Sequence, residues 1–158
     1  MFRINAEVTY IAFTNQYNPK KMKAANITLV YDGQTEAAFT FYKSIFGGEF
    51  SNVSRMKDMP GPTPLSAEES EKILHMAYPV GNSVLMGMDM PKGRGTVNMG
   101  NNFMVTIDTS SEEETTQFFN GLAEGGFVMM PVAHQPWGAF FGMLTDKFGI
   151  QWMLSYVK

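Results

Sequence analysis

The chain has 158 residues, no cysteine and a net charge of −3, with 44% hydrophobic and 17% charged residues. This length suits one domain with a substantial core, and the missing cysteine excludes disulfides, thiolate nucleophiles and thiolate metal sites. There is no basic block, no apolar run near the ~18 residues of a membrane span and no apolar core of a signal peptide, so we expect a cytoplasmic protein that binds neither nucleic acid nor membrane.

The first 21 residues match nothing later in the chain. Residues 8–13 alternate in a way that allows a strand, and a turn-like break at 17–21 precedes Met22. We therefore place a single domain at 22–158. Residues 1–21 are then an extension, either an edge strand or a read-through segment.

The domain contains a tandem repeat. The stretch 26–32 (NITLVYD) resembles 102–108 (NFMVTID), an offset of 102 − 26 = 76. A helical pattern follows each stretch and ends in paired glycines, which tolerate the left-handed conformation of a helix C-cap. The repeat predicts two modules, at about 24–89 and 102–158.

The first module reads as a strand at 26–31, a helix at 34–46, a strand at 49–56 and two strands at 73–80 and 83–89. A Gly-Asn pair joins the last two strands, which is a strong hairpin signal. The prolines between 57 and 70 predict a loop.

The second module repeats this order. We expect a strand at 103–108, a helix that Ser110 caps together with Glu113, and strands at 127–133, 140–144 and 150–157. Each module is thus β-α-β-β-β, and the fold is α+β. Two such sheets side by side would curve into a half-open, eight-stranded, barrel-like cleft.

This order resembles the vicinal oxygen chelate superfamily of glyoxalase I, extradiol dioxygenases and bleomycin-resistance proteins. The PhnB-like group within it, also described as 3-demethylubiquinone methyltransferase-like, is the most similar. The resemblance spans about 23–158 and rests on Gly33, Phe41-Tyr42, the segments 73–75 and 88–91, and the run 137–153 (WGAFFGMLTDKFGIQWM).

The resemblance implies a divalent metal held by His, Glu or Gln from the first and last strand of each module. Counting along the repeat puts those positions near Asn26 or Thr28, at 102–104, at Leu85 (or Met86) and at Met153. The last strands therefore offer no carboxylate or imidazole, the donors that such cations require. We predict no metal centre of the superfamily type and no cofactor.

Candidate ligand-binding residues come from the methionine-rich and aromatic strands and from the two histidines of the chain. His75 is either a hydrogen-bonded residue of the sheet or a polar contact to a ligand, and His134 is either a solvated loop residue or a residue at the cleft mouth. Asp146 fits a turn in which its side chain accepts from backbone amides. The candidates for the cleft are His75, Met86, Met104, His134, Trp137, Phe141 and Met153.

Three functions remain open from the sequence. The first is a homodimeric protein that binds a small apolar or aromatic molecule without metal, as in the bleomycin-resistance branch. The second is a lyase, isomerase or dioxygenase with a displaced metal held by His75 and a carboxylate such as Glu49 or Asp89. The third is a non-catalytic dimeric interaction module. Methyltransferase activity of the common type is not expected, because no glycine-rich turn follows a strand and opens a helix.

Overall fold

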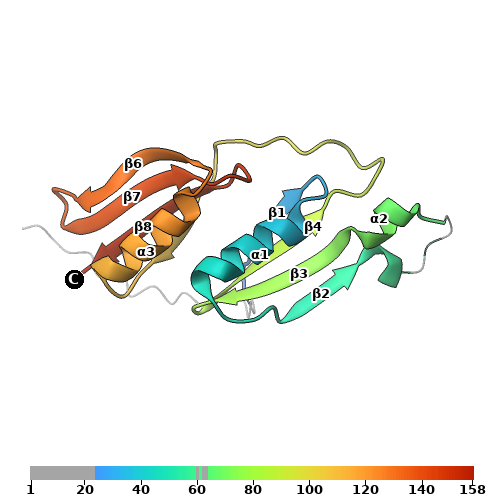
Figure 1. Cartoon of the computed structure of the whole chain (residues 1–158), viewed down its shortest axis with the longest axis horizontal. Helices are drawn as coiled ribbons and strands as arrows, with labels where there is room; N and C mark the ends of the chain where they lie inside the picture. Colours follow the sequence, from blue (N-terminus) through green and yellow to red (C-terminus); the bar gives the residue numbers. More distant parts are fainter. Residues whose placement is uncertain (1–23, 60, 62–63) are drawn as a thin grey trace, which may run out of the picture.

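The computed structural model describes residues 24–59, 61 and 64–158, so the expectation for residues 1–21 lies outside the described part (Figure 1). The predicted order of elements is confirmed in both modules. The first module consists of β1 (Ile27–Tyr31), α1 (Thr35–Phe46), β2 (Asn52–Arg55), β3 (Ile73–Val80) and β4 (Ser83–Asp89). The second consists of β5 (Val105–Asp108), α3 (Glu112–Ala123), β6 (Phe127–His134), β7 (Ala139–Thr145) and β8 (Gln151–Val157).

Two short helices lie where the sequence predicted only a loop. These are η1 (Met56–Asp58) and α2 (Ala67–Glu71), on either side of the prolines. The side chain of Ser66 accepts a hydrogen bond from the backbone N–H of Glu69, which caps α2. The sequence did not indicate α2, because the helix follows a proline-rich segment and its five residues are too few to show a helical period.

Each module forms one four-stranded sheet, in the order β1-β4-β3-β2 and β5-β8-β7-β6. The first and last strands of each module pair in parallel, and the other neighbours are antiparallel. Figure 1 shows the two modules side by side along the long axis of the molecule, with α1 and α3 next to each other. The fold is therefore α+β with two separate mixed sheets and no closed barrel.

Side chains outside each of the two long helices accept hydrogen bonds from the backbone N–H groups of its first turn. In α1, the buried Asp89 accepts from the backbone N–H of Thr35 at 3.0 Å and from its hydroxyl at 2.6 Å. In α3, the N-cap is Ser111, whose hydroxyl accepts from the N–H of Glu114. Our prediction of Ser110 was wrong by one residue, because two serines followed by three glutamates satisfy the capping pattern in two registers.

One continuous core joins the modules through their helices. Phe46 of α1 packs edge-on against Phe118 of α3, with ring centroids 5.1 Å apart. Trp152 of the second sheet lies 5.1 Å from Tyr42 of the first module. Both helices therefore cover one common layer, and no helix of the described residues lies on the opposite face of either sheet, which we call the uncovered face.

A single buried carboxylate links the two modules by hydrogen bonds. Asp146, in the β7–β8 turn, accepts from the backbone N–H groups of Phe148 and Ile150 at 2.8 and 3.0 Å, as the turn interpretation predicted. Its second oxygen accepts from the hydroxyl of Tyr42 at 2.7 Å and from the indole N–H of Trp152 at 2.8 Å. Tyr42 accepts in turn from the hydroxyl of Tyr31, at 2.9 Å.

Burial keeps the phenols of this network protonated. Loss of water contact raises the pKa of Tyr31 and Tyr42, and the Asp146 carboxylate raises both further by charge repulsion. Both hydroxyls are therefore protonated at neutral pH and can donate hydrogen bonds.

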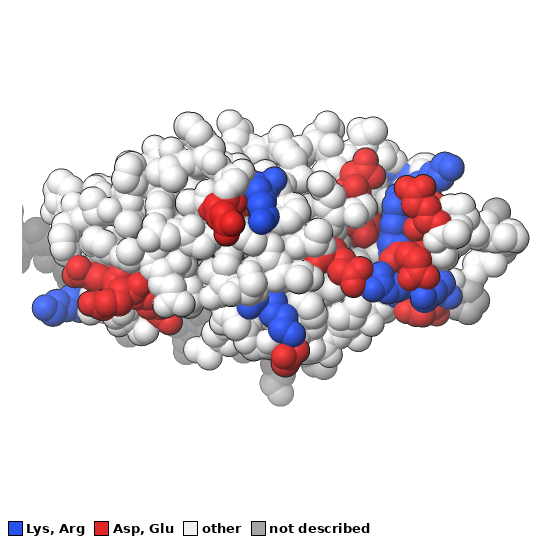
Figure 2. Space-filling view, viewed as in Figure 1, with Lys and Arg blue, Asp and Glu red and all other residues white. Residues whose placement is uncertain are grey.

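The second sheet has an uncovered face with an unusual composition. Strands β6, β7 and β8 contain no Lys, Arg, Asp or Glu. Many charges gather at the far end of the first module, where Arg55 pairs with Glu36 and Lys57 with Glu71 (Figure 2). Within residues 24–59, 61 and 64–158, no helix is both long and apolar enough to cross a membrane.

Replacing Asp146 tests the link between the modules. Asp146→Ala leaves two side-chain and two backbone donors without their acceptor in the core, so we expect the free energy of unfolding to fall by about 3 kcal/mol. Tyr42→Phe removes one donor and should cost about 1 kcal/mol. Urea titration followed by tryptophan fluorescence measures both, with the exposed Asp32→Ala as the control. Equal stability of Asp146→Ala and the control would contradict the assignment.

Candidate functional site

Most of the residues predicted for the cleft lie on the uncovered faces of the two sheets. On the first sheet, Met86 is half-buried beside Thr28 of β1. His75 lies on the same face, opposite Ser54, and its Nδ1 is 3.2 Å from Oδ1 of Asn52. Its ring is thus held by a neighbouring strand, as expected of a structural histidine.

On the second sheet, Met153 lies between Thr106 and Met143, and Met143 pairs with Met130, so methionines cross the face from β8 to β6. Phe141 shares this face, and Trp137 packs edge-on against it with 6.0 Å between centroids. Trp137 is itself 65% exposed, and Met104 is half-buried just before β5.

His134 lies apart from these residues. It pairs with Phe140, which points to the face opposite Phe141, and stacks on its ring at 5.0 Å. Its Nε2 lies 3.5 Å from a carboxylate oxygen of Glu112, at the start of α3. The structure therefore places His134 on the helix side of the second sheet, away from the methionines.

Counting along the repeat placed only some of the expected metal-ligand positions correctly. Leu85 is turned toward the helix side and is 6% exposed, so the position on the uncovered face is Met86. In the second module, the first-strand residue beside Met153 is Thr106, two residues beyond the stretch we predicted. Leu85 and Met86 differ by one residue, which moves the side chain to the opposite face of the strand. Met104 and Thr106 differ by two residues, which keeps the face and moves the position along the strand.

The four side chains at these positions do not fit a divalent metal. Thr28, Met86, Thr106 and Met153 supply two hydroxyls and two thioethers, whereas hard divalent cations take carboxylate, carbonyl or imidazole donors. The residues at the superfamily's metal positions are therefore the wrong donors.

A displaced metal at His75 does not gain a carboxylate from the residues that the sequence suggested. Asp89 faces the helix side, where Thr35 and the N–H of Ile73 occupy both of its oxygens. Glu49 is exposed and pairs with Lys43 at 2.5 Å. Across the described part of the chain, no group of three or more His, Asp or Glu side chains is arranged to hold a metal ion.

A cavity that was not predicted lies between the modules. It has a volume of about 730 Å³, which is in the range of small-molecule sites. In each module, one residue of the first strand and its partner on the last strand line the cavity. These are Ile27 with Leu85 and Val105 with Trp152. Corresponding strands of the repeat thus contribute side chains to one shared space.

Aromatic rings and carboxylates complete the lining of this intermodular cavity. Phe46 and Phe118 are half-buried at the cavity, with ring centroids 5.1 Å apart, and Phe46 packs on the fully buried Trp152 at 5.8 Å. Among the described residues that line the cavity, the charged ones are Asp108 and Glu114. Hydrogen bonds from the side chain and backbone of Ser110 hold the pKa of Glu114 below its usual value.

None of the seven residues predicted for the cleft lines the intermodular cavity. The predicted residues lie on the strands away from this cavity, which is lined by the ends of β1, β4, β5 and α1. The repeat was the signal in the sequence that could have indicated this cavity. It makes β1 and β5 corresponding strands, and each of them, with Ile27 and Val105 respectively, lies at the edge of its own sheet.

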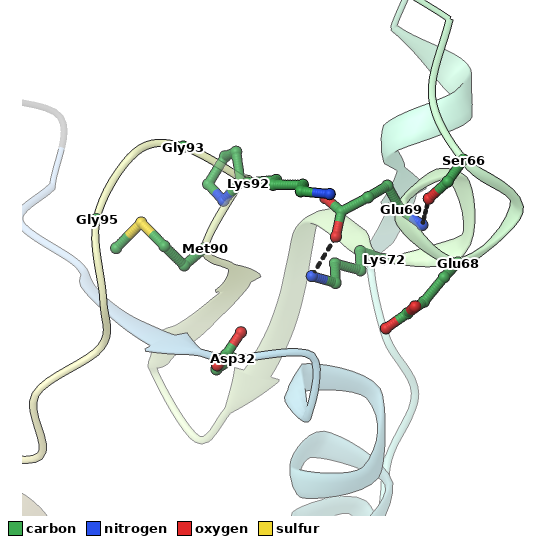
Figure 3. Close-up of a pocket in the computed structure, with 10 residues that line it drawn as sticks. Asp32, Ser66, Glu68, Glu69, Lys72, Met90, Lys92, Gly93 and Gly95 are labelled. Carbon is green, nitrogen blue, oxygen red and sulfur yellow. Dashed lines mark hydrogen bonds and ion pairs between the residues drawn. The ribbon is translucent and has the colours of Figure 1, made fainter.

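A second cavity, of about 370 Å³, lies between α2 and the segment after β4 (Figure 3). Two of its charged residues form an ion pair: Lys72 lies 2.5 Å from Glu69, and this contact lowers the pKa of Glu69 and raises that of Lys72. The backbone of Lys92 also bonds to Glu69. These contacts explain the cavity as an ion-pair network that fastens α2 to the segment linking the modules.

Comparison with known proteins identifies the family. A family model described as 3-demethylubiquinone-9 3-methyltransferase matches residues 23–155. The chain belongs to this PhnB-like family. The crystal structure of protein PA1353 from Pseudomonas aeruginosa is similar, with a TM-score of 0.73 and 32% identity over 85% of this chain and 98% of that one. The PhnB protein from Bacillus cereus has a TM-score of 0.65 and 26% identity, over 85% of this chain and 100% of that one.

Two further comparisons agree with this assignment. Protein YjdN of Escherichia coli (strain K12) is 28% identical over 139 residues, which are 82% of this chain and 92% of YjdN. A glyoxalase/bleomycin resistance/dioxygenase family enzyme from Burkholderia phytofirmans PsJN shares the fold, with a TM-score of 0.57 and 13% identity over 85% of this chain and 100% of that one. The predicted resemblance to the PhnB-like group is confirmed, and the fold is the predicted glyoxalase-like one.

Metal analysis tests whether the side chains of Thr28, Met86, Thr106 and Met153 fail to bind a divalent metal. We expect untagged protein, purified without chelator, to contain far less than one equivalent of Mn, Ni, Fe or Zn, because the first- and last-strand positions hold hydroxyls and thioethers. Elemental analysis measures the content, and calorimetric titration with Mn²⁺ and Ni²⁺ should give no stoichiometric heat. One equivalent that survives in the Met153→Ala variant would show that another donor set binds it.

Proposed function

We propose that this PhnB-like chain binds a small apolar or aromatic molecule, without the superfamily's metal centre. The observation that carries the proposal is the intermodular cavity, whose volume of about 730 Å³ and aromatic wall suit a compact hydrophobic ligand. Burial of such a ligand against Phe46 and Phe118 would supply most of the affinity. A cavity of this size also speaks against an interaction module whose interior is filled by its own side chains.

The methyltransferase description of the family is not part of this proposal. Methyl transfer from S-adenosylmethionine in enzymes of the common type uses a doubly wound parallel sheet with a glycine-rich turn between a strand and a helix. Here, the described residues form two mixed sheets, and the segment with Gly93 and Gly95 leads to no helix. We therefore propose binding, and assign no reaction to the chain.

We also propose that the chain acts as a homodimer that covers the uncovered face of the second sheet. Three adjacent strands there carry no charge, and side chains as large as Phe127, at 69%, and Met130, at 37%, are exposed. Exposed apolar patches of this kind mark interaction surfaces, and methionines adapt readily to a partner. A second copy is the simplest partner, because one symmetric contact then buries this face on both copies.

Filling the cavity tests ligand binding. N-phenyl-1-naphthylamine, an uncharged fluorescent probe, should bind the protein, and Ile27→Trp should weaken it at least about tenfold, because the larger side chain occupies the cavity. Ile27 is 44% exposed, so the variant should fold. Val53→Trp is the matched control, since Val53 is 45% exposed on β2 and does not line the cavity. Equal affinity of the two variants for the probe would overturn the proposed site.

Charging the uncovered face tests the dimer. Met143 is half-buried at the centre of this face, so Met143→Lys should convert a dimer to a monomer, because a desolvated ammonium would have no partner there. Gln117→Lys, on an exposed turn of α3, adds the same charge away from the face and should leave the dimer intact. Light scattering after gel filtration gives the mass of each species. A monomeric parent protein would rule the proposal out.

A further inference from the structure

The uncovered face of the second sheet carries sulfur donors that the proposed cavity does not use. Met130 of β6 pairs with Met143 of β7, and Met143 pairs with Met153 of β8, so three methionines form a row across the sheet. We infer that this methionine row, together with Met129, is a site for a soft monovalent cation, Cu(I) or Ag(I). The inference goes beyond the proposed function, because it depends neither on the intermodular cavity nor on a second copy of the chain.

The methionine row lies on one face of the sheet. Leu144 is fully buried and Gly142 packs against α3, so Met143 between them points away from the helix. Residues that pair directly on neighbouring strands share a face, which places Met130 and Met153 on either side of Met143. The Cβ atoms of such pairs are about 5 Å apart, and the three rotatable bonds of a methionine let neighbouring sulfurs converge on one ion.

A β-bulge brings a fourth thioether to this face. The pairing of β6 with β7 is irregular between Val128 and Met130, where Met129 is the extra residue. Consecutive residues of a regular strand point to opposite faces, whereas a bulge redirects a side chain. The sulfur of Met129 accepts a hydrogen bond from the hydroxyl of Thr145 at 3.7 Å, and Thr145 lies two residues beyond Met143, on the same face. The bulge therefore gives β6 two adjacent sulfur donors on the uncovered face.

The donors of this site suit a soft ion. Thioether sulfur favours Cu(I) and similar monovalent ions, whereas hard divalent cations take carboxylate, carbonyl or imidazole donors. Strands β6, β7 and β8 contain no Asp or Glu, and the imidazole of His134 lies on the helix side of β6. Met129 and Met130 are exposed, and Met143 and Met153 are half-buried, so an ion can reach the sulfurs from solvent. The side chains of the row thus select for soft cations and against hard ones.

Titration with Ag⁺ tests the site. Silver nitrate in chloride-free buffer is added to the full chain labelled with methyl-¹³C methionine, and each ε-methyl resonance is assigned from its own Met→Leu variant. We expect one equivalent to shift the resonances of Met129, Met130, Met143 and Met153 before those of the other methionines. Met143→Leu keeps the apolar volume but removes the central sulfur, so calorimetry should show Ag⁺ affinity at least about tenfold weaker. Met59→Leu, at a 56% exposed position after η1, is the matched control.

The outcomes distinguish a metal site from a merely apolar surface. Shifts that need several equivalents of Ag⁺, or that appear equally at Met59, overturn the inference. Met153→Leu gives a second measurement, and full Ag⁺ affinity in either this variant or Met143→Leu also overturns it. Because leucine preserves the apolar face, light scattering should give both variants the mass of the parent protein. Binding of N-phenyl-1-naphthylamine should be the same with and without Ag⁺, so failure of this site and failure of the proposed function are separate results.

Discussion

The arrangement of the molecule depends on one buried carboxylate. Asp146 closes the β7–β8 turn with one oxygen and binds Tyr42 and Trp152 with the other. Because Tyr42 belongs to the first module, the angle between the modules is set at this point. The intermodular cavity exists because the modules are joined here, through the turn and the helices, while the starts of β1 and β5 remain apart.

The network also explains why the two halves of the repeat differ. In the first module, an aspartate at the end of β4 holds the start of α1, whereas in the second module Thr109 bonds to Thr115 at 2.6 Å near the start of α3. The carboxylate of the second module lies instead in a turn and binds the first module. Duplication thus produced two similar sheets, and the later differences made one half depend on the other.

Much of the fold could be predicted from the sequence, because repeats, glycine turns and apolar periods are local. The hairpin turns and the role of Asp146 toward its own backbone are of this kind. The partner of its side chain was not predictable, since Tyr42 lies 104 residues earlier in the chain. The candidate site was harder to predict. The face on which Leu85 or His134 lies depends on strand register and on bulges, and the cavity depends on how the two modules pack.

The row of methionines on the second sheet makes the molecule chemically sensitive. Met130, Met143 and Met153 are neighbours on a face without charge, and each thioether is partly accessible to solvent. Oxidants convert a thioether to a sulfoxide, which is polar and no longer packs as a hydrocarbon. A few such events would change the character of the whole face while the aspartate network and the core stayed intact. The surface chemistry of this protein therefore depends on the redox state of its surroundings.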